Sequence, residues 1–281
     1  MSNVAEDLLR HRTDRAMRAA DYLMEDPRES GRLAAKVNAD DWVERYCAEI
    51  LRRYPPCASV LDVGCGPGVL ASVLACRTPA ATVCGVDRSA DRMRALKSDT
   101  CPNIRRVQGD ARSLAFPGES FDFVYSRFLL EYLSDRKQAV DEMVRVCKRG
   151  GTVLLQDLDG QLLWHYPEDP ELQALTLKVL EGLQSTGFDP FIGRKLFSLV
   201  RGAGLTNIDV KVEGYHVVAG RINDHDHALW DTKLDIALPA ITQVIGSAAL
   251  ARDLKRRFMS YLQRDDTLTY SVVFTVSGMK S

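Results

Sequence analysis

Three absences in this 281-residue sequence argue against whole classes of function. Its seven cysteines form an odd set without a Cys-x-x-Cys pair, so we expect neither a disulfide framework nor a metal site. Lysine and arginine total 37 against 38 acidic residues, whereas nucleic-acid binding normally needs a clustered basic face. No run approaches the ~18 apolar residues that cross a bilayer. We therefore expect no nucleic acid, membrane or metal among the partners.

The composition instead fits an ordinary globular protein. Residues 1–7 carry acids where a secretory signal would carry lysine or arginine, so the sequence predicts a cytoplasmic protein. A chain of this length can bury about 75% of its unfolded surface, enough for one large α/β domain with helical additions. Most cysteines are expected to be small, buried apolar side chains.

Strand and helix patterns alternate through the middle of the sequence. Apolar runs predict parallel strands, and the segment 136–148 has one apolar helical face before Gly150 and Gly151 stop it. The predicted strands span residues 59–63, 82–87, 104–108, 121–125 and 152–157. This alternation predicts an α/β fold with a Rossmann-like, doubly wound, mostly parallel sheet.

The flanking segments are predicted to be mainly helical. The predicted helices are 4–24 and 40–53 before the sheet, 171–184 after it, and one that opens at Asp189 and Pro190. Residues 207–218 and 270–276 complete a seven-stranded sheet whose last strand is antiparallel. About fifty mostly helical residues, interrupted at Pro239, separate these two strands.

We predict four stretches along the chain. They are an N-terminal helical cap segment (1–55), a Rossmann-like core (56–220), a helical cap insertion (221–265) and the last core strand (266–281). The two helical pieces are predicted to pack together as a lid over a bound ligand. The N-terminal helices could also hold a homo-oligomer together.

The most informative motif lies in the first predicted strand and the loop after it. Residues 60–68 read Val-Leu-Asp-Val-Gly-Cys-Gly-Pro-Gly, and Asp87 ends the next strand. Alternating glycines let a ligand lie on bare backbone, because glycine has no Cβ. The two oxygens of Asp87 suit a ribose diol. The pattern predicts a nucleoside-containing cofactor at the carboxyl ends of adjacent strands.

The motif resembles the first motif of the class I S-adenosylmethionine (SAM) dependent methyltransferases, an acidic residue followed by Gly-x-Gly-x-Gly. The resemblance continues through Gly109-Asp110-Ala111, the run 120–133, and Lys148-Arg-Gly-Gly-Thr-Val-Leu-Leu, so that it covers residues 60–157. The pattern is most similar to the small-molecule and quinone-type methyltransferases of this family. The long helical insertion before the last strand departs from the family, whose last two strands usually form a near-direct hairpin.

The resemblance implies a cofactor site for SAM and its product S-adenosylhomocysteine. Asp87 would bind the ribose hydroxyls, Asp62 would orient the methionine end directly or through water, and Asp110 would accept from the adenine amine. The implied cofactor-binding residues are Asp62, Gly64, Cys65, Gly66, Gly68, Asp87, Arg88, Met93, Asp110, Ala111, Ser126 and Arg127. Arg88 equally suits a solvated position, and Met93 also has the spacing of a core residue.

Two other functions fit part of this pattern. Gly66-x-Gly68-x-x-Ala71 also fits a relaxed dinucleotide fingerprint, which would make the chain a nicotinamide-dependent oxidoreductase. Asp62 argues against it, because a carboxylate at that strand tip would repel a pyrophosphate. The second alternative is a SAM-binding regulator or scaffold that transfers no methyl group.

Methyl transfer from a sulfonium mainly needs alignment and exclusion of water, and a base helps when the acceptor is a hydroxyl or an acidic carbon. His165 and Asp159 are the candidate bases, because both follow the fifth predicted strand. His165 also suits a packed position in the loop. The other candidates, for which the sequence gives less support, are His216, His225 and His227.

Aromatic residues supply a candidate acceptor pocket. If the two helical pieces meet over the sheet, Tyr22, Trp42, Trp164 and Trp230 would favour a flat or isoprenoid small-molecule acceptor, as in quinone-like or natural-product biosynthesis. Each of these residues also suits the core. The sequence leaves open whether oxygen, nitrogen or carbon is methylated.

Overall fold

A computed structural model of the chain describes residues 23–38, 58–94 and 101–281. The helices predicted at 4–24 and 40–53 lie outside the described residues, except for residues 23 and 24. The strands are β1 (Ser59–Val63), β2 (Thr82–Asp87), β3 (Ile104–Gln108), β4 (Phe121–Arg127), β5 (Cys147–Tyr166), β6 (Thr206–Ala219) and β7 (Leu268–Met279). The α-helices are α2 (Pro27–Asn38), α4 (Val69–Arg77), α5 (Ala90–Arg94), α6 (Arg136–Val146), α7 (Pro170–Leu183), α8 (Leu196–Gly202), α9 (Asp224–Ile245) and α10 (Ala248–Leu262). The short 3-10 helices among the described residues are η1 (Leu130–Tyr132), η2 (Gln184–Thr186) and η3 (Gly193–Lys195).

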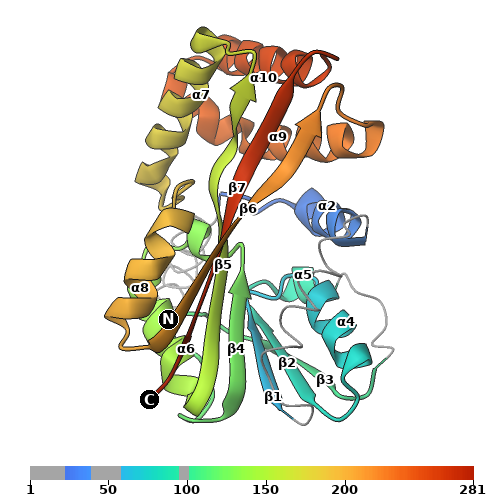
Figure 1. Cartoon of the computed structure of the whole chain (residues 1–281). Coiled ribbons are helices and arrows are strands. Elements are labelled where there is room, and N and C mark those ends of the chain that lie inside the picture. The colour runs from blue at the N-terminus through green and yellow to red at the C-terminus, as the bar shows by residue number, and fades with distance from the viewer. Residues whose placement is uncertain (1–22, 39–57, 95–100) are drawn as a thin grey trace, which may run out of the picture.

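The strands form one seven-stranded sheet in the order β3-β2-β1-β4-β5-β7-β6 (Figure 1). Neighbours from β3 to β5 run parallel, whereas β7 is antiparallel to both β5 and β6. Side chains of β1 alternate between the two faces: Val60 packs with α4, and Leu61 and Val63 pack with α6. The predicted doubly wound, mostly parallel sheet is confirmed.

Strand β5 is much longer than predicted. It was expected at 152–157, and it spans Cys147–Tyr166 because β7 pairs with it along most of that length. The pairing with β7 shifts register in β5 after Asp159 and in β6 after Tyr215. Bulges of this kind bend a strand. Beyond them, the three strands extend to helices α7, α9 and α10, which we call the helical lobe (Figure 1).

The helical lobe has its own hydrophobic core, and this core corrects one prediction. Pro239 does not interrupt the insertion, because α9 runs through it. A proline inside a helix costs about 3 kcal/mol. Here Trp230 and Ile236 before the proline and Ile241 after it are all buried in the lobe core. Their burial holds the helix together across the break in its hydrogen bonds.

Two other helix boundaries differ from prediction. Helix α6 ends at Val146, because Cys147 already begins β5. The helix predicted from Asp189 and Pro190 begins later, with η3 at Gly193. Asp189 instead holds a turn, since its Oδ1 accepts a hydrogen bond from the backbone N–H of Phe191 at 3.1 Å.

Helix α2 was not predicted, although the sequence carries a start signal for it. Pro27 occupies the first helical position, and the preceding Asp26 accepts from the backbone N–H of Arg28 at 2.9 Å. The helix packs against α4 and α9. It therefore lies beside the insertion, in the region where the lid was expected (Figure 1).

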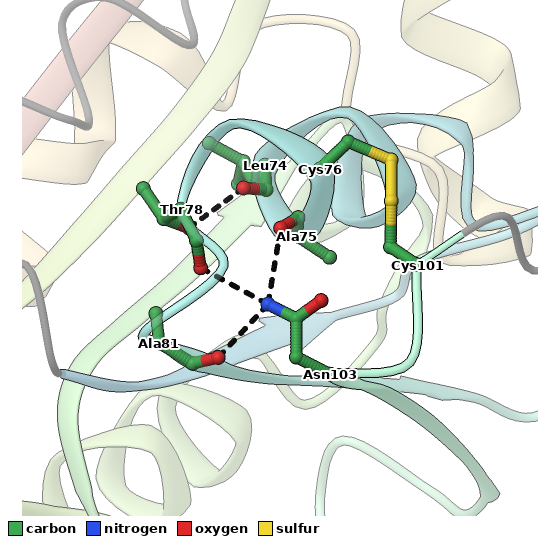
Figure 2. Close-up of a disulfide and its surroundings, with 7 residues drawn as sticks. All are labelled: Leu74, Ala75, Cys76, Thr78, Ala81, Cys101 and Asn103. Carbon is green, nitrogen blue, oxygen red and sulfur yellow. Dashed lines mark hydrogen bonds between the residues drawn. A yellow bond between two sulfur atoms is a disulfide. The ribbon is translucent and has the colours of Figure 1, made fainter.

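A disulfide joins Cys76, in the last turn of α4, to Cys101, just before β3 (Figure 2). The odd set of cysteines argued against a disulfide framework, and it gave no sign of this single cross-link. Next to it, Asn103 donates from Nδ2 to the carbonyl oxygens of Ala75 and Thr78, both at 3.0 Å. The two cysteines are 25 residues apart, with Cα atoms 5.4 Å from each other, and only the packing of α4 beside β3 brings them together. Among the free cysteines, Cys84 and Cys147 are buried, as expected.

Opening this disulfide is expected to destabilise the core. A cross-link across a loop of this length restricts the unfolded chain, so reduction should lower the free energy of unfolding by about 3 kcal/mol. Denaturant titration of the wild-type chain with and without dithiothreitol measures the difference. Cys76→Ser should show the lower stability in both conditions. Equal stability of the oxidised and reduced wild type would contradict the prediction.

Candidate active site

A cavity lies at the carboxyl ends of β1, β2 and β4. The loops after β1, β3 and β4 and the end of β2 line it from the sheet. Helix α2 contributes Glu29, Arg32, Leu33 and Lys36, and α9 contributes Lys233. The cavity thus sits where β1 has β2 on one side and β4 on the other, the switch point at which open α/β sheets bind ligands.

Glycine is required in the loop after β1. Gly64, Gly66 and Gly68 have φ angles of 77°, 55° and 81°, a region that favours glycine. The N–H of Gly64 donates to the carbonyl oxygen of Val86 at 2.8 Å, which ties the loop to β2. A Cβ at Gly64 would lie 2.8 Å from Cδ1 of Leu129. The loop therefore presents bare backbone to the cavity.

Asp87 lines the cavity at the end of β2. Its Oδ2 accepts from the N–H of Gly66 and its Oδ1 from the N–H of Ser89, both at 2.8 Å. The Nε of Arg92 lies 3.5 Å from Oδ1. A carboxylate offers about four lone-pair sites, so these contacts leave capacity for hydroxyl donors. Asp87 therefore both shapes the glycine loop and presents acceptors to the cavity.

Asp62 is buried at the tip of β1. Burial raises the pKa of its carboxyl to about 7, although a hydrogen bond from Tyr125 opposes this increase. The negative charge of Asp87 adds to the increase. The carboxyl is thus close to its midpoint at neutral pH. A cation entering the cavity would favour its charged form.

Most of the predicted cofactor-binding residues meet at this cavity. Those that line it are Asp62, Gly64, Cys65, Gly66, Asp87, Arg88, Asp110, Ala111 and Arg127. Gly68, Met93 and Ser126 are not among the lining residues. Gly68 is the N-cap of α4, Met93 lies in α5, and Ser126 is buried within β4.

Asp110 is held in place by its neighbour Arg112. The Nη2 of Arg112 lies 2.8 Å from Oδ2 of Asp110, and the backbone N–H of Arg112 donates to Oδ1 at 2.9 Å. The side-chain hydrogen bond from Arg112 is the largest cause of a lowered pKa at Asp110. Asp110 is therefore an ionised acceptor at the β3 side of the cavity.

At the opposite end of the cavity, beyond β4, lies a polar network of three side chains. Buried Gln161 donates from Nε2 to Oε2 of Glu131 at 2.7 Å, and its Oε1 accepts from Nζ of Lys233 at 2.5 Å. Burial raises the pKa of the Glu131 carboxyl and lowers that of Lys233 to about 8. We call this region the acceptor end, because it lies past the glycine loop and its two acids.

Aromatic rings and further cations surround the acceptor end. The Nζ of Lys36 lies 5.0 Å from the ring centroids of Phe128 and Tyr215, and Arg127 donates from Nη2 to the hydroxyl of Tyr215 at 3.3 Å. The ring of His216 lies 4.1 Å from that of Tyr215. Burial, followed by the nearby cations, depresses the pKa of His216 well below its usual value. His216 is therefore neutral at physiological pH.

The structure places both candidate bases away from the cavity. Asp159 is buried, and its carboxylate accepts from the Nε of Arg194 at 2.8 Å and from the backbone N–H of Arg194 at 2.9 Å. His165 lies near the far end of β5, with its ring 4.9 Å from that of Tyr261 in the helical lobe. His225 and His227, in the first turns of α9, are also not among the lining residues.

The predicted aromatic pocket has no counterpart among the described residues. Trp164 and Trp230 pack in the core of the helical lobe, and neither is among the residues that line the cavity. Trp230 instead lies beneath the acceptor end, with Nζ of Lys233 4.8 Å from its ring centroid. Tyr22 and Trp42 lie outside the described residues.

Sequence reasoning missed the residues of the acceptor end. Glu131 lies inside the motif at 120–133, but the resemblance assigns it no role, and Lys36 lies on the unpredicted helix α2. No local sequence motif marks Lys233 or Gln161 as a site residue. The start signal at Asp26 and Pro27 was the one clue that could have revealed α2.

No three His, Cys, Asp or Glu side chains gather into a metal-binding group within residues 23–38, 58–94 and 101–281. In the same part of the chain, no helix combines the length and apolar character needed to cross a membrane.

Comparison with known proteins agrees with this geometry. Residues 61–155 match the family described as "Methyltransferase domain". Trans-aconitate 2-methyltransferase of Deinococcus radiodurans is 37% identical over 101 residues, which cover 36% of this chain and 38% of that protein. The uncharacterized methyltransferase YcgJ of Bacillus subtilis is 38% identical over 119 residues, which cover 40% of this chain and 43% of that protein. The chain therefore spans about two fifths of the length of these relatives.

Solved structures share the fold over a longer stretch. The crystal structure of YcgJ protein from Bacillus subtilis superposes with a TM-score of 0.58 and 19% identity, over 85% of this chain and 99% of that one. Phosphoethanolamine N-methyltransferase 2 of Haemonchus contortus, in complex with SAM, gives 0.51 and 18% over 87% of this chain and 57% of that one. The family match, the strand order and the glycine loop between two acids agree: residues 61–155 match a methyltransferase domain, and the chain has the fold of solved SAM-dependent methyltransferases.

Proposed function

We propose that this chain binds SAM in the cavity and transfers its methyl group to a small organic acceptor. One observation carries the proposal: the glycine backbone after β1, the carboxylates of Asp62 and Asp87, and a polar acceptor end line the same cavity. The first two features suit a nucleoside joined to an amino acid. The third suits a second small molecule beside it.

The lining residues fit SAM in both charge and shape. Asp87 would accept from the ribose hydroxyls, and the ionised form of Asp62 would bind the methionine ammonium. Lys36 and Arg127 line the cavity and lie over the ring of Phe128, just after β4, and they suit the methionine carboxylate. When bound, SAM supplies an electrophilic methyl group on a sulfonium.

The chain's own contribution is to orient the reactants and to exclude water. Helices α2 and α9 line the cavity opposite the sheet, and orientation alone can supply about 7 to 11 kcal/mol of the barrier. Glu131, whose pKa is raised by burial, lines the acceptor end and would take a proton from an acceptor hydroxyl or amine.

The finer assignments stay predictions. They are an acceptor from quinone-like or natural-product biosynthesis, the atom that is methylated, a cytoplasmic location and a homo-oligomer held by N-terminal helices. The relatives do not identify the acceptor, because their names refer to different ones, among them trans-aconitate and phosphatidylethanolamine.

Incubation of the full chain with methyl-labelled SAM and a panel of phenols, amines, carboxylic acids and quinones tests the proposal. We expect label to appear in at least one acceptor, and SAM but not NADH to bind in a calorimetric titration. Binding of SAM without transfer to any acceptor would favour a regulator or scaffold. Binding of NADH in place of SAM would overturn the proposal.

A further inference from the structure

The acceptor end of the cavity gathers cations from three separate elements. Lys36 comes from α2, Arg127 from the end of β4 and Lys233 from α9, and all three line the cavity. Arg32 lines it as well, but its guanidinium is paired with Glu29, with Nε 2.7 Å from Oε2. Positive charge is therefore concentrated at the end where the acceptor is expected.

Lys233 is the most informative of these cations. Among the described residues, its Nζ has a single hydrogen bond, to the neutral amide oxygen of Gln161 at 2.5 Å, and no ion pair. The ring of Trp230 supports the ammonium from 4.8 Å. An ammonium has three N–H donors, so two remain for a ligand in the cavity.

The nearest candidate counter-ion does not reach Lys233 directly. Gln161 stands between the two groups, since its Nε2 donates to Oε2 of Glu131 at 2.7 Å while its Oε1 accepts from Lys233. Burial also raises the pKa of the Glu131 carboxyl, which weakens it as a counter-ion for Lys233. A cation held away from water without a paired anion is costly, so the site gains stability when a ligand supplies the anion.

We propose that the methyl acceptor carries an anionic oxygen group, a carboxylate or a phosphate, and that Lys233 binds this group. The inference rests on the proposed function and narrows its acceptor class. Gln161 and Trp230 fix the ammonium in position, and the charge of Lys36 adds to the attraction. Lys36 and Arg127 would also bind the methionine carboxylate of SAM, whereas Lys233 reaches the cavity from α9 in the helical lobe.

Anion binding to the full chain saturated with S-adenosylhomocysteine tests this assignment. The probes are citrate for a carboxylate and inorganic phosphate for a phosphate, with glycerol as the uncharged control and ionic strength held constant with sodium chloride. We expect one of the two anions, and not glycerol, to bind in calorimetry. Lys233→Met should weaken that binding about tenfold or more, because a charge-assisted hydrogen bond is lost. Lys178→Met, at an exposed lysine on α7, should leave it within about threefold.

The outcomes separate the inference from the proposed function. Equal anion affinity in wild type and Lys233→Met, or no anion binding while S-adenosylhomocysteine binds, would overturn the inference alone. A loss of S-adenosylhomocysteine affinity in Lys233→Met would also overturn it, because Lys233 would then belong to the cofactor site. Failure of S-adenosylhomocysteine to bind the wild type would overturn the proposed function. If circular dichroism shows that Lys233→Met is unfolded, Lys233→Gln takes its place, because it removes the charge but keeps a donor to Gln161. Lys233→Arg keeps the positive charge and should retain anion binding.

Discussion

Replacing Asp87 with alanine is expected to raise the dissociation constant for SAM about tenfold or more while the fold is retained. Two hydrogen bonds to the ribose diol would be lost, each worth about 0.5 to 1.5 kcal/mol net. The loop after β1 would also lose one of its ties to β2, because Oδ2 of Asp87 accepts from the N–H of Gly66 at 2.8 Å. Isothermal titration calorimetry measures the effect, with circular dichroism as the check on folding.

A nearby acid supplies the matched control. Asp91 lies four residues further along, and its side chain is 88% exposed and paired with Arg94 at the surface. Asp91→Ala should leave the affinity for SAM within about twofold of wild type, because exposed ion pairs contribute little. Wild-type affinity in a folded Asp87→Ala variant would remove the central support for the cofactor assignment.

The affinity for SAM is expected to depend steeply on pH because of Asp62. Burial raises the pKa of this carboxyl to about 7 in the free protein, and a bound ammonium would lower it. Binding then releases a proton at low pH, so affinity should rise about tenfold per pH unit up to about pH 7. It should level off there and fall above about pH 8, where an α-amino group loses its own proton.

Calorimetry in buffers of different ionisation enthalpy detects that proton release directly. Asp62→Asn cannot ionise, so it should bind SAM more weakly and show no rise in affinity between about pH 6 and pH 7. His216 should not contribute, since its depressed pKa keeps it neutral throughout this range. A flat pH profile in the wild type would show that Asp62 does not face the cofactor's ammonium.

The cofactor half of the site could be predicted because its residues lie in short, contiguous motifs. Glycines at alternate positions and the acids Asp62 and Asp87 each mark a strand end, and parallel strands bring their carboxyl ends to one edge of the sheet. The structure brings most of these residues to one cavity. Met93 and Ser126 do not line the cavity, because consecutive side chains of a strand or a short helix point in different directions.

The candidate bases show where this reasoning fails. Asp159 and His165 were chosen because they follow the fifth predicted strand, but β5 continues through both of them. Pairing with β7 carries the chain past the cavity toward the helical lobe, and Arg194 pairs with Asp159 on the way. The length of a paired strand depends on its partner, which lies over a hundred residues away in the sequence.

The sequence by itself determined the parallel sheet, the order of its motifs and the glycine loop with its two acids. Each of these depends on local periodicity and on the backbone conformations that nearby residues allow. Only the tertiary structure decided the acceptor end, the continuity of α9 through Pro239 and the pairing of Cys76 with Cys101. Lys36, Glu131, Gln161 and Lys233 come from α2, η1, β5 and α9. Their meeting depends on burial and packing between distant segments, which no spacing along the chain encodes.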